Sequence, residues 1–288
     1  MFLFSMSDPD AFVVGKNLAV TPGKVIFRNR LLELIKYTPA TKKTHAQPLL
    51  IIPPWINKFY IFDLRQDFSF VKWLVDAGVE VYMVSWVNPS LKHTDLTLTD
   101  YVFNGIKEAV DHLRQFHDSI NVLGYCAGGI SLSCYLSTIN NDAFIKSATF
   151  VATPVDGNTM GDLLVYLCKE QLRMLQEHSK KSGLIDGNAM AWSFNLLRPS
   201  DLIWSYYVNN YLLGQKPKAF DFLHWNTDTT RLPAKMHYEY LSSFFIKNLL
   251  LKPRGFKLGG NSINLRQIKI PIFVMAAIDD HIAPWKSA

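Results

Sequence analysis

The sequence is poor in cysteine and in charge and has no long hydrophobic run, and each shortage excludes a class of protein. Three cysteines in 288 residues, none in a Cys-x-x-Cys pair, argue against a disulfide framework and against a metal site such as structural zinc. No apolar stretch approaches the roughly 18 residues that a membrane span needs, so we expect no transmembrane segment. The first residues lack the basic region of a signal peptide. These absences favour a globular, cytoplasmic protein.

The charge balance is mildly basic and does not indicate a nucleic-acid partner. Lysine and arginine total 30 and aspartate and glutamate total 24, but the basic residues are scattered along the chain. Apolar residues make up 49% of the sequence and charged residues 19%, a mixture that excludes a disordered chain. We therefore expect a folded protein with a sizeable core and no nucleic-acid function.

Strands and helices alternate in the first half of the chain. Short apolar runs predict strands, and apolar stripes that repeat every three to four residues predict helices between them. The expected strands are 47–54, 79–87, 120–125 and 147–152, and the expected helices are 68–77, 99–116 (capped by Thr99 or Asp100) and 131–137. This alternation predicts a mostly parallel sheet with helices on both faces.

The alternation stops after residue 154, and a strand pattern returns only at 268–278. Between Met190 and Phe245, 13 of 56 residues are aromatic, which fits the core of a small helical subdomain, a lid over an apolar substrate or a partner surface. We expect four parts: the end of an N-terminal domain or a linker with loops at Pro22, Gly23 and Pro39 (1–46), a first part of the core (47–154), a mainly helical cap (155–266) and a second part of the core (267–288).

The strongest local signal is Gly124-Tyr-Cys-Ala-Gly-Gly129, which lies between an expected strand and an expected helix. This is the setting of a nucleophile elbow, with cysteine where serine is commoner. The turn leaves no room for side chains two positions before and after the nucleophile, which gives Gly124 and Gly128 a steric reason to be glycine. The helix N-terminus is expected to favour the reactive thiolate of Cys126. Cys134 and Cys168 are interpreted as small buried hydrophobes.

A nucleophile elbow needs an acid after a later strand, and then a histidine. The strand at 268–278 ends in Asp279-Asp280, and either aspartate fits the acid. The histidine is not evident, because His281 is adjacent to Asp280 and cannot comfortably turn back to hydrogen-bond with it. The histidines of the 155–266 segment, His178, His224 and His237, are interpreted as ordinary surface or core residues.

Catalysis at such a nucleophile also needs backbone N–H groups that bind the developing oxyanion. Ala127, directly after the cysteine, is expected to supply one of them. The loop Pro53-Pro-Trp-Ile-Asn-Lys58 follows the first core strand and is expected to supply the second, at Ile56.

Several blocks of the sequence resemble the polyhydroxyalkanoate synthases, closest to the long class I enzymes that take short-chain 3-hydroxyacyl thioesters. The blocks are residues 48–64, the 124–129 elbow, residues 222–233 and Asp280-His-Ile-Ala-Pro-Trp285, in the family's order over most of residues 8–288. The resemblance implies an α/β-hydrolase fold with an inserted cap and a Cys–His–Asp triad. By position, it implies these site residues: Cys126 as acyl-bearing nucleophile, Asp280 as triad acid, Ile56 and Ala127 as oxyanion donors, and Asn57, Trp225 and His281 as supporting residues.

The resemblance also implies the reaction and its setting. It indicates an acyltransferase that polymerises (R)-3-hydroxyacyl-CoA and releases CoA, without a cofactor, as a homodimer on the growing polyester chain at the surface of cytoplasmic granules. The family's catalytic histidine lies in a Gly-His turn beyond Ala288, and most of its extra N-terminal domain is absent. The chain is therefore expected to be an internal piece of a synthase, inactive alone.

The sequence leaves two other functions open. A thiol-dependent α/β hydrolase acting on a soluble ester or lactone fits the cysteine elbow, but it explains neither the large aromatic insertion nor the other blocks. A non-catalytic protein that coats polyester or lipid inclusions through its aromatic residues is the second alternative. Activity that survives Cys126→Ala would favour this last interpretation.

Overall fold

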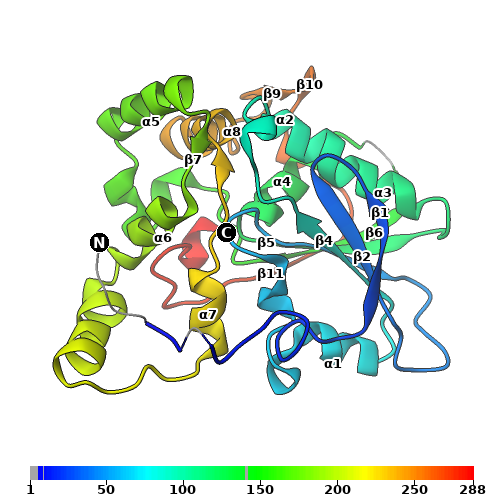
Figure 1. The fold of residues 1–288 in the computed structure, drawn as a ribbon. Coiled ribbons are helices and arrows are strands. Elements are labelled where there is room, and N and C mark those ends of the chain that lie inside the picture. Colours follow the sequence, from blue (N-terminus) through cyan, green and yellow to red (C-terminus); the bar gives the residue numbers. More distant parts are fainter. Residues whose placement is uncertain (1–5, 9, 140–141) are drawn as a thin grey trace.

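A seven-stranded sheet forms the centre of the protein (Figure 1), whose computed structural model describes residues 6–8, 10–139 and 142–288. Five neighbouring strands are parallel to one another. The other two form an antiparallel hairpin that extends the sheet at one edge. The mostly parallel sheet predicted from the alternation is confirmed. In order across the sheet, the strands are β1 (Gly23–Arg28), β2 (Leu32–Tyr37), β4 (Val81–Trp86), β3 (Leu49–Ile52), β5 (Ile120–Tyr125), β6 (Ile145–Val151) and β11 (Ile272–Met275).

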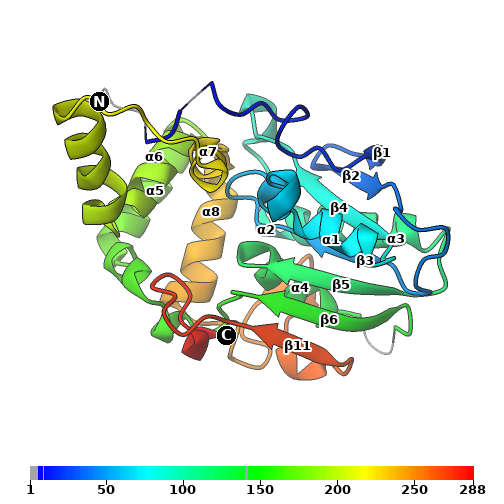
Figure 2. The same cartoon turned by 90° about the horizontal axis from the view of Figure 1, so that it is seen from below.

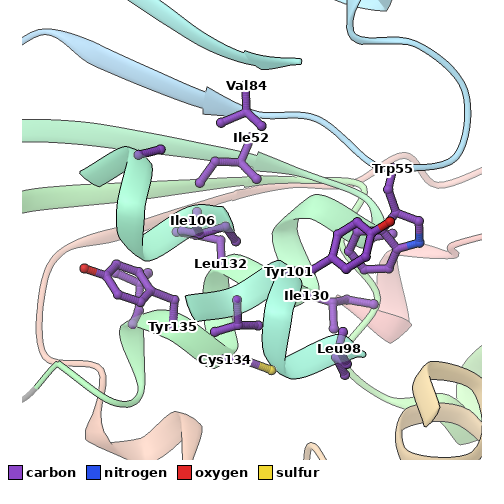
Figure 3. Close-up of a cluster of buried hydrophobic side chains, with 14 of the residues drawn as sticks. Ile52, Trp55, Val84, Leu98, Tyr101, Ile106, Ile130, Leu132, Cys134 and Tyr135 are labelled. Atoms are coloured by element: carbon purple, nitrogen blue, oxygen red, sulfur yellow. The ribbon is translucent and has the colours of Figure 1, made fainter. Parts of the chain in front are cut away.

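Alternate residues of the central strands enter two separate hydrophobic layers. Leu50 and Ile52 of β3 belong to the larger layer, whereas Ile51 between them belongs to the layer on the opposite face. Strand side chains point to opposite faces with a period of two, so a fully apolar strand fills both layers. Figure 3 shows the larger layer, where Ile52 and Val84 of the sheet face helical residues such as Leu132.

Helices cover both faces of the sheet, as the alternation predicts (Figure 1). One face carries α1 (Phe70–Asp76), and the other carries a longer helical run and the helix after β5. The run consists of α2 (Leu98–Asp100), the π-helical stretch η4 (Tyr101–Lys107) and α3 (Glu108–Leu113), and the helix after β5 is α4 (Ala127–Leu136). Short 3₁₀ turns are η1 (Phe59–Phe62), η2 (Gln66–Phe68), η3 (Leu91–His93), η5 (Gly157–Thr159), η6 (Asp162–Tyr166), η10 (Leu265–Gln267) and η11 (Trp285–Ser287).

The cap of the long helical run differs from the prediction. Thr97 is the N-cap, and its backbone N–H donates to Asp100 Oδ2 at 2.8 Å. The expected cap, Thr99 or Asp100, is therefore wrong, because Asp100 is the third helical residue of a capping box and not the cap itself.

Two strands lie in a region where we expected loops. Residues 23–37 form the antiparallel pair β1 and β2, and β2 pairs with β4 from Leu32 opposite Trp86 to Lys36 opposite Tyr82. The expected loops at Pro22 and Gly23 are thus replaced in part by a hairpin, which extends the central sheet; whether residues 1–46 are the end of an N-terminal domain or a linker stays a prediction. The turn residues around the hairpin favour loops in the sequence pattern. The strands form because β2 pairs with β4, about 50 residues later, and a local pattern does not show that contact.

The segment between β6 and β11 is mainly helical, and its helices α5 to α8 lie beyond the carboxyl ends of the parallel strands (Figure 2). It is called the cap below. Its elements are α5 (Lys169–Lys181), α6 (Gly187–Asn195), α7 (Asp221–Thr227) and α8 (Ala234–Tyr240), the π-helical stretches η7 (Ser200–Trp204), η8 (Tyr207–Leu212) and η9 (Leu241–Ile246), and the short strand pairs β7 (Leu184–Ile185) with β8 (Leu232–Pro233) and β9 (Lys257–Leu258) with β10 (Asn261–Ser262). None of the described helices has the length and apolar character needed to cross a membrane.

Candidate active site

Cys126 occupies a strained turn between β5 and α4. Its backbone has φ 50° and ψ −123°, a conformation that residues other than glycine rarely adopt, and its N–H donates to the carbonyl of Val151 at 3.0 Å. Strain of this kind persists only where the surrounding structure holds it, and it is concentrated at functional sites. The turn has the strand–turn–helix geometry of the predicted nucleophile elbow, and the role of Cys126 as nucleophile stays a prediction.

The glycines around Cys126 are required by close backbone contacts. A Cβ at Gly124 would lie 2.5 Å from the Cα of Gly129, and a Cβ at Gly128 would lie 2.4 Å from the carbonyl oxygen of Ile52. Both separations are far below van der Waals contact, and at each position the obstacle is main chain and cannot rotate away. The steric reason proposed for Gly124 and Gly128 is confirmed.

The thiol of Cys126 is not activated by its own surroundings. Burial raises its pKa to about 11, the backbone N–H of Ala127 lowers it, and the negative charge of Asp280 raises it further. The helix N-terminus does favour the thiolate through the backbone N–H of Ala127, as expected, but the loss of hydration outweighs this effect. At neutral pH the sulfur keeps its proton, and the chemistry needs a base.

Asp280 lies in the loop after β11, within electrostatic reach of Cys126. Its Oδ1 accepts the backbone N–H groups of Ile282 at 2.8 Å and Ala283 at 2.9 Å, and both of these residues line the cavity at Cys126. The neighbouring Asp279 is exposed. Within residues 6–8, 10–139 and 142–288, no histidine side chain hydrogen-bonds with Asp280 or Cys126. Of the two aspartates left open by the sequence, the geometry favours Asp280.

The loop after β3 presents Ile56 to the cavity and is fastened to the cap. Asn57, with φ 66°, donates its backbone N–H to Thr230 Oγ1 at 3.1 Å. Its Nδ2 donates to the carbonyl of Asn226 at 3.0 Å, and Trp225 donates from Nε1 to the carbonyl of Lys58 at 2.7 Å. Asn57 and Trp225 thus fasten the loop to the cap, and neither residue lines the cavity.

The cavity beside Cys126 has a volume of about 240 Å³. Ile56, Cys126 and Ala127 line it together, so three of the residues expected at the site meet in one space. The rest of its wall comes mainly from apolar side chains of the cap. This wall includes Met160, Leu163, Leu167, Leu172, Leu175, Met190, Phe194, Leu241 and Phe245.

Two residues of the sequence interpretation lie elsewhere. His281 contributes its backbone carbonyl, which accepts the N–H of Asp162 at 2.7 Å, and its ring makes no hydrogen bond within the described parts of the chain. Cys168 is exposed, whereas Cys134 is buried in the larger hydrophobic layer. The interpretation of Cys168 as a buried hydrophobe is wrong, since it precedes an amphipathic surface helix, α5.

Sequence reasoning missed two polar residues at the site. His237 of α8 lines the cavity, although the sequence suggested only an ordinary surface or core histidine. Thr230 holds the loop of Ile56 through hydrogen bonds to Asn57 and Trp55. Both come from the 222–240 stretch, and the only signal that marks it is the block at residues 222–233.

Two family models match the chain, and the residues they match overlap. A model described as the N-terminus of poly-beta-hydroxybutyrate polymerase (PhaC) matches residues 1–74, and a model of the alpha/beta hydrolase fold matches residues 48–288. Among solved structures, a monoglyceride lipase from Saccharomyces cerevisiae superposes with a TM-score of 0.55 over 96% of this chain and 82% of its own, at 11% identity. This likeness concerns the fold alone, and with the matching model it confirms the expected α/β-hydrolase fold.

Curated relatives share much more of the sequence. A poly(3-hydroxyalkanoate) polymerase of Methylorubrum extorquens is 45% identical over 282 residues, which are 96% of this chain and 46% of that protein. The polymerase subunit PhaC of Cupriavidus necator is 37% identical over 294 residues, 99% of this chain and 50% of its own. The subunit PhaC of Thiocystis violacea is 31% identical over 273 residues, 92% of this chain and 75% of its own. The chain spans about half the length of the first two.

Proposed function

Because the chain belongs to the poly(3-hydroxyalkanoate) polymerase family, we propose that it transfers (R)-3-hydroxyacyl groups from CoA to Cys126 and polymerises them, releasing CoA. The observation that carries the proposal is the strained Cys126, which shares an apolar cavity with Ile56 and Ala127. A cysteine fixed at a strand–helix turn beside two candidate oxyanion donors is equipped for acyl transfer.

The choice of sulfur suits a polymerase better than a hydrolase. Transfer from CoA to Cys126 exchanges one thioester for another, so the acyl group keeps its activation while it waits for the next hydroxyl. A serine at this position would form an oxygen ester and lose much of that activation before chain growth. The thioester is itself the activated species, and the proposal includes no cofactor.

The first half-reaction forms the Cys126 thioester. The sulfur attacks the thioester carbon, the carbonyl oxygen becomes an oxyanion held by the N–H groups of Ile56 and Ala127, and collapse expels CoA as its thiol. Because burial holds the pKa of Cys126 near 11, the proton must leave to a base as the sulfur attacks. We propose that Asp280 orients that base, in keeping with its place beside the cavity.

The second half-reaction transfers the acyl group to the 3-hydroxyl of another unit. The hydroxyl loses its proton to the base, its oxygen attacks the Cys126 thioester, and the cysteine leaves as a thiol. Water would give free acid at this step, and the apolar side chains of the cap lower its access. The proposed role of the cap is thus to favour transfer of the acyl group to a hydroxyl over its hydrolysis by water.

We further propose that the protein works at the surface of polyester granules in the cytoplasm. The cap exposes several large apolar side chains to solvent. The exposed fraction is 53% for Trp204 in η7, 59% for Tyr211 in η8 and 62% for Leu213, which follows η8. An exposed apolar group of this size is typical of a surface that binds an apolar partner. The homodimer implied by the family resemblance stays a prediction.

The decisive experiment follows the acyl group. The protein is purified at the full length of its relatives, so that the expected histidine is present, and is mixed with (R)-3-hydroxybutyryl-CoA. CoA release is measured, and mass spectrometry of the tryptic peptide carrying Cys126 detects the 3-hydroxybutyryl adduct. We expect the adduct and CoA release, both absent in Cys126→Ala and both present in the control Cys134→Ala. Insoluble polyester supports polymerisation, whereas free 3-hydroxybutyrate alone supports the thiol-dependent hydrolase. CoA release that persists in Cys126→Ala would reject both enzymatic functions.

A further inference from the structure

The cavity at Cys126 contains a buried histidine that the reaction above does not use. His237 of α8 lines the cavity and is only 5% exposed. Its Nδ1 is buried with no hydrogen-bond partner, and neither ring nitrogen forms a hydrogen bond within the described residues. Polar groups buried to this degree nearly always have a partner. Because Nδ1 is closed off from the cavity, a group that binds there meets the ring at its other nitrogen, Nε2.

The ring is held in its uncharged form by its surroundings. Burial lowers the pKa of His237 to about 4, so at neutral pH one ring nitrogen is a donor and the other an acceptor. The ring lies nearly parallel to that of Tyr240, with 6.3 Å between the centroids. A neutral ring of this kind is a poor base but suits a ligand that both donates and accepts a hydrogen bond.

The other polar residues of the cavity wall are less suited to this role. Ser193 already donates to the carbonyl of Ala189 at 3.0 Å, and Gln171 is exposed to solvent. Tyr240 is buried beside His237, and its hydroxyl makes no hydrogen bond within the described residues. Tyr166 also lines the cavity but is only half-buried. Among the buried side chains of the wall, Tyr240 is therefore the rival for the same ligand group, and the test below separates it from His237.

The chemistry of the acyl group indicates which of its polar groups could hydrogen-bond with His237. The carbonyl oxygen is assigned to the backbone of Ile56 and Ala127, and a short 3-hydroxyacyl group has one other polar substituent, the hydroxyl two carbons further on. A hydroxyl both donates and accepts, as a neutral imidazole does. We infer that His237 binds the 3-hydroxyl of the acyl group and so selects 3-hydroxyacyl thioesters over plain acyl thioesters. This inference rests on the proposed function and names its specificity residue.

The size of the cavity agrees with a short acyl group. A volume of about 240 Å³ lies below the roughly 300–1,000 Å³ of pockets for larger ligands. A short acyl chain places its hydroxyl a few ångströms from the sulfur, and the cavity of Cys126 has His237 in its wall at the cap side.

The test measures binding, so that it does not depend on turnover. In protein carrying Cys126→Ala, calorimetry gives the Kd of (R)-3-hydroxybutyryl-CoA and of butyryl-CoA, which lacks the hydroxyl. We expect His237→Phe to weaken binding of the hydroxyacyl ligand about fivefold and to leave butyryl-CoA unchanged, because only one neutral hydrogen bond is lost. His237→Gln and His237→Asn, which keep a polar atom near Nε2 and Nδ1 respectively, identify the nitrogen that binds.

Each outcome is decisive. Equal weakening of both ligands, or none of either, overturns the role of His237, and a selective loss in Tyr240→Phe with none in His237→Phe transfers the role to Tyr240. If neither thioester binds the Cys126→Ala protein, the proposed function itself fails. Should His237→Phe not fold, the ring ¹⁵N resonances of His237, identified by their absence in His237→Gln, must shift with the hydroxyacyl ligand and not with butyryl-CoA. A ring that responds to neither refutes the inference.

Discussion

The side-chain hydroxyl of Thr230, in the cap, accepts the backbone N–H of Asn57, in the core, at 3.1 Å. The same hydroxyl donates to the carbonyl of Trp55 at 2.9 Å. Thr230 therefore holds the residue on each side of Ile56, the candidate second oxyanion donor. The buried hydroxyl of Thr230 thus fixes the direction of the Ile56 backbone N–H without contacting it.

Thr230→Val tests this link, since valine keeps the shape and removes both hydrogen bonds. We expect the rate of Cys126 acylation to fall roughly tenfold with little change in KM, because a misdirected oxyanion donor weakens the transition state more than substrate binding. We also expect a loss of about 1 kcal/mol in the free energy of unfolding. Thr230→Ser, which keeps the hydroxyl, should restore the rate. A rise in KM at constant kcat would contradict the positioning role.

Gly128→Ala should be severely destabilising. The added Cβ would lie 2.4 Å from the carbonyl oxygen of Ile52, so β3 and α4 must separate, and we expect a loss of about 3 kcal/mol or more in urea unfolding. Gly105→Ala is the matched comparison, because its Cβ meets the ring of Trp86 at 2.7 Å and a side chain can move. Equal losses of unfolding free energy in the two variants would show that the backbone at the elbow can move aside as readily as the Trp86 ring.

Alkylation of Cys126 should report the charge of Asp280. With a pKa of about 11 the thiol is protonated at neutral pH, so its rate with iodoacetamide should rise about tenfold per pH unit between pH 7 and 10. Asp280→Asn removes a negative charge that raises this pKa, and we expect alkylation at pH 8 to become about threefold faster. Asp279→Asn, which alters the exposed neighbour, is the control. Equal rates in both variants and the parent would place Asp280 outside the site.

Stability should fall in mild acid because of His237. Burial lowers its pKa from 6.5 to about 4 in the folded protein, so between these values the unfolded chain takes up the proton first. The free energy of unfolding then decreases as the pH falls from about 6.5 to 4, by about 3 kcal/mol for a shift of this size. His237→Gln should remove this part of the slope in urea titrations at pH 4 to 7. A slope that the substitution leaves unchanged would show that the folded protein protonates the ring freely.

The elbow could be predicted from sequence because its constraints are local. Gly124, Cys126 and Gly128 lie within five residues, and the contacts that exclude a Cβ come from the turn and from the adjacent strand β3. A short, rigid motif between a strand and a helix carries its own geometry. The sequence narrows the candidate acid to Asp279 or Asp280 for the same reason, since both follow the end of a strand, and its catalytic role stays a prediction.

Thr230 and His237 could not be predicted, because nothing near them in the sequence marks their role. Thr230 is separated from Asn57 by 173 residues, and its function exists only when cap and core meet. His237 is distinguished by a missing hydrogen-bond partner, which only the packed structure reveals. The hairpin of β1 and β2 was missed on similar grounds, since its place in the sheet depends on β4.

Thr230 and His237 stand on one short stretch of the cap, joined by β8 and the start of α8. In the proposed mechanism, one end of this stretch sets the direction of the Ile56 amide and the other faces the acyl chain. The proposal therefore couples rate to selectivity, and a substitution in the stretch that broadens the choice of monomer is expected to change the rate of the reaction as well. For engineering, residues 225–240 are best exchanged between relatives as one unit, since single replacements would separate two functions that share a backbone.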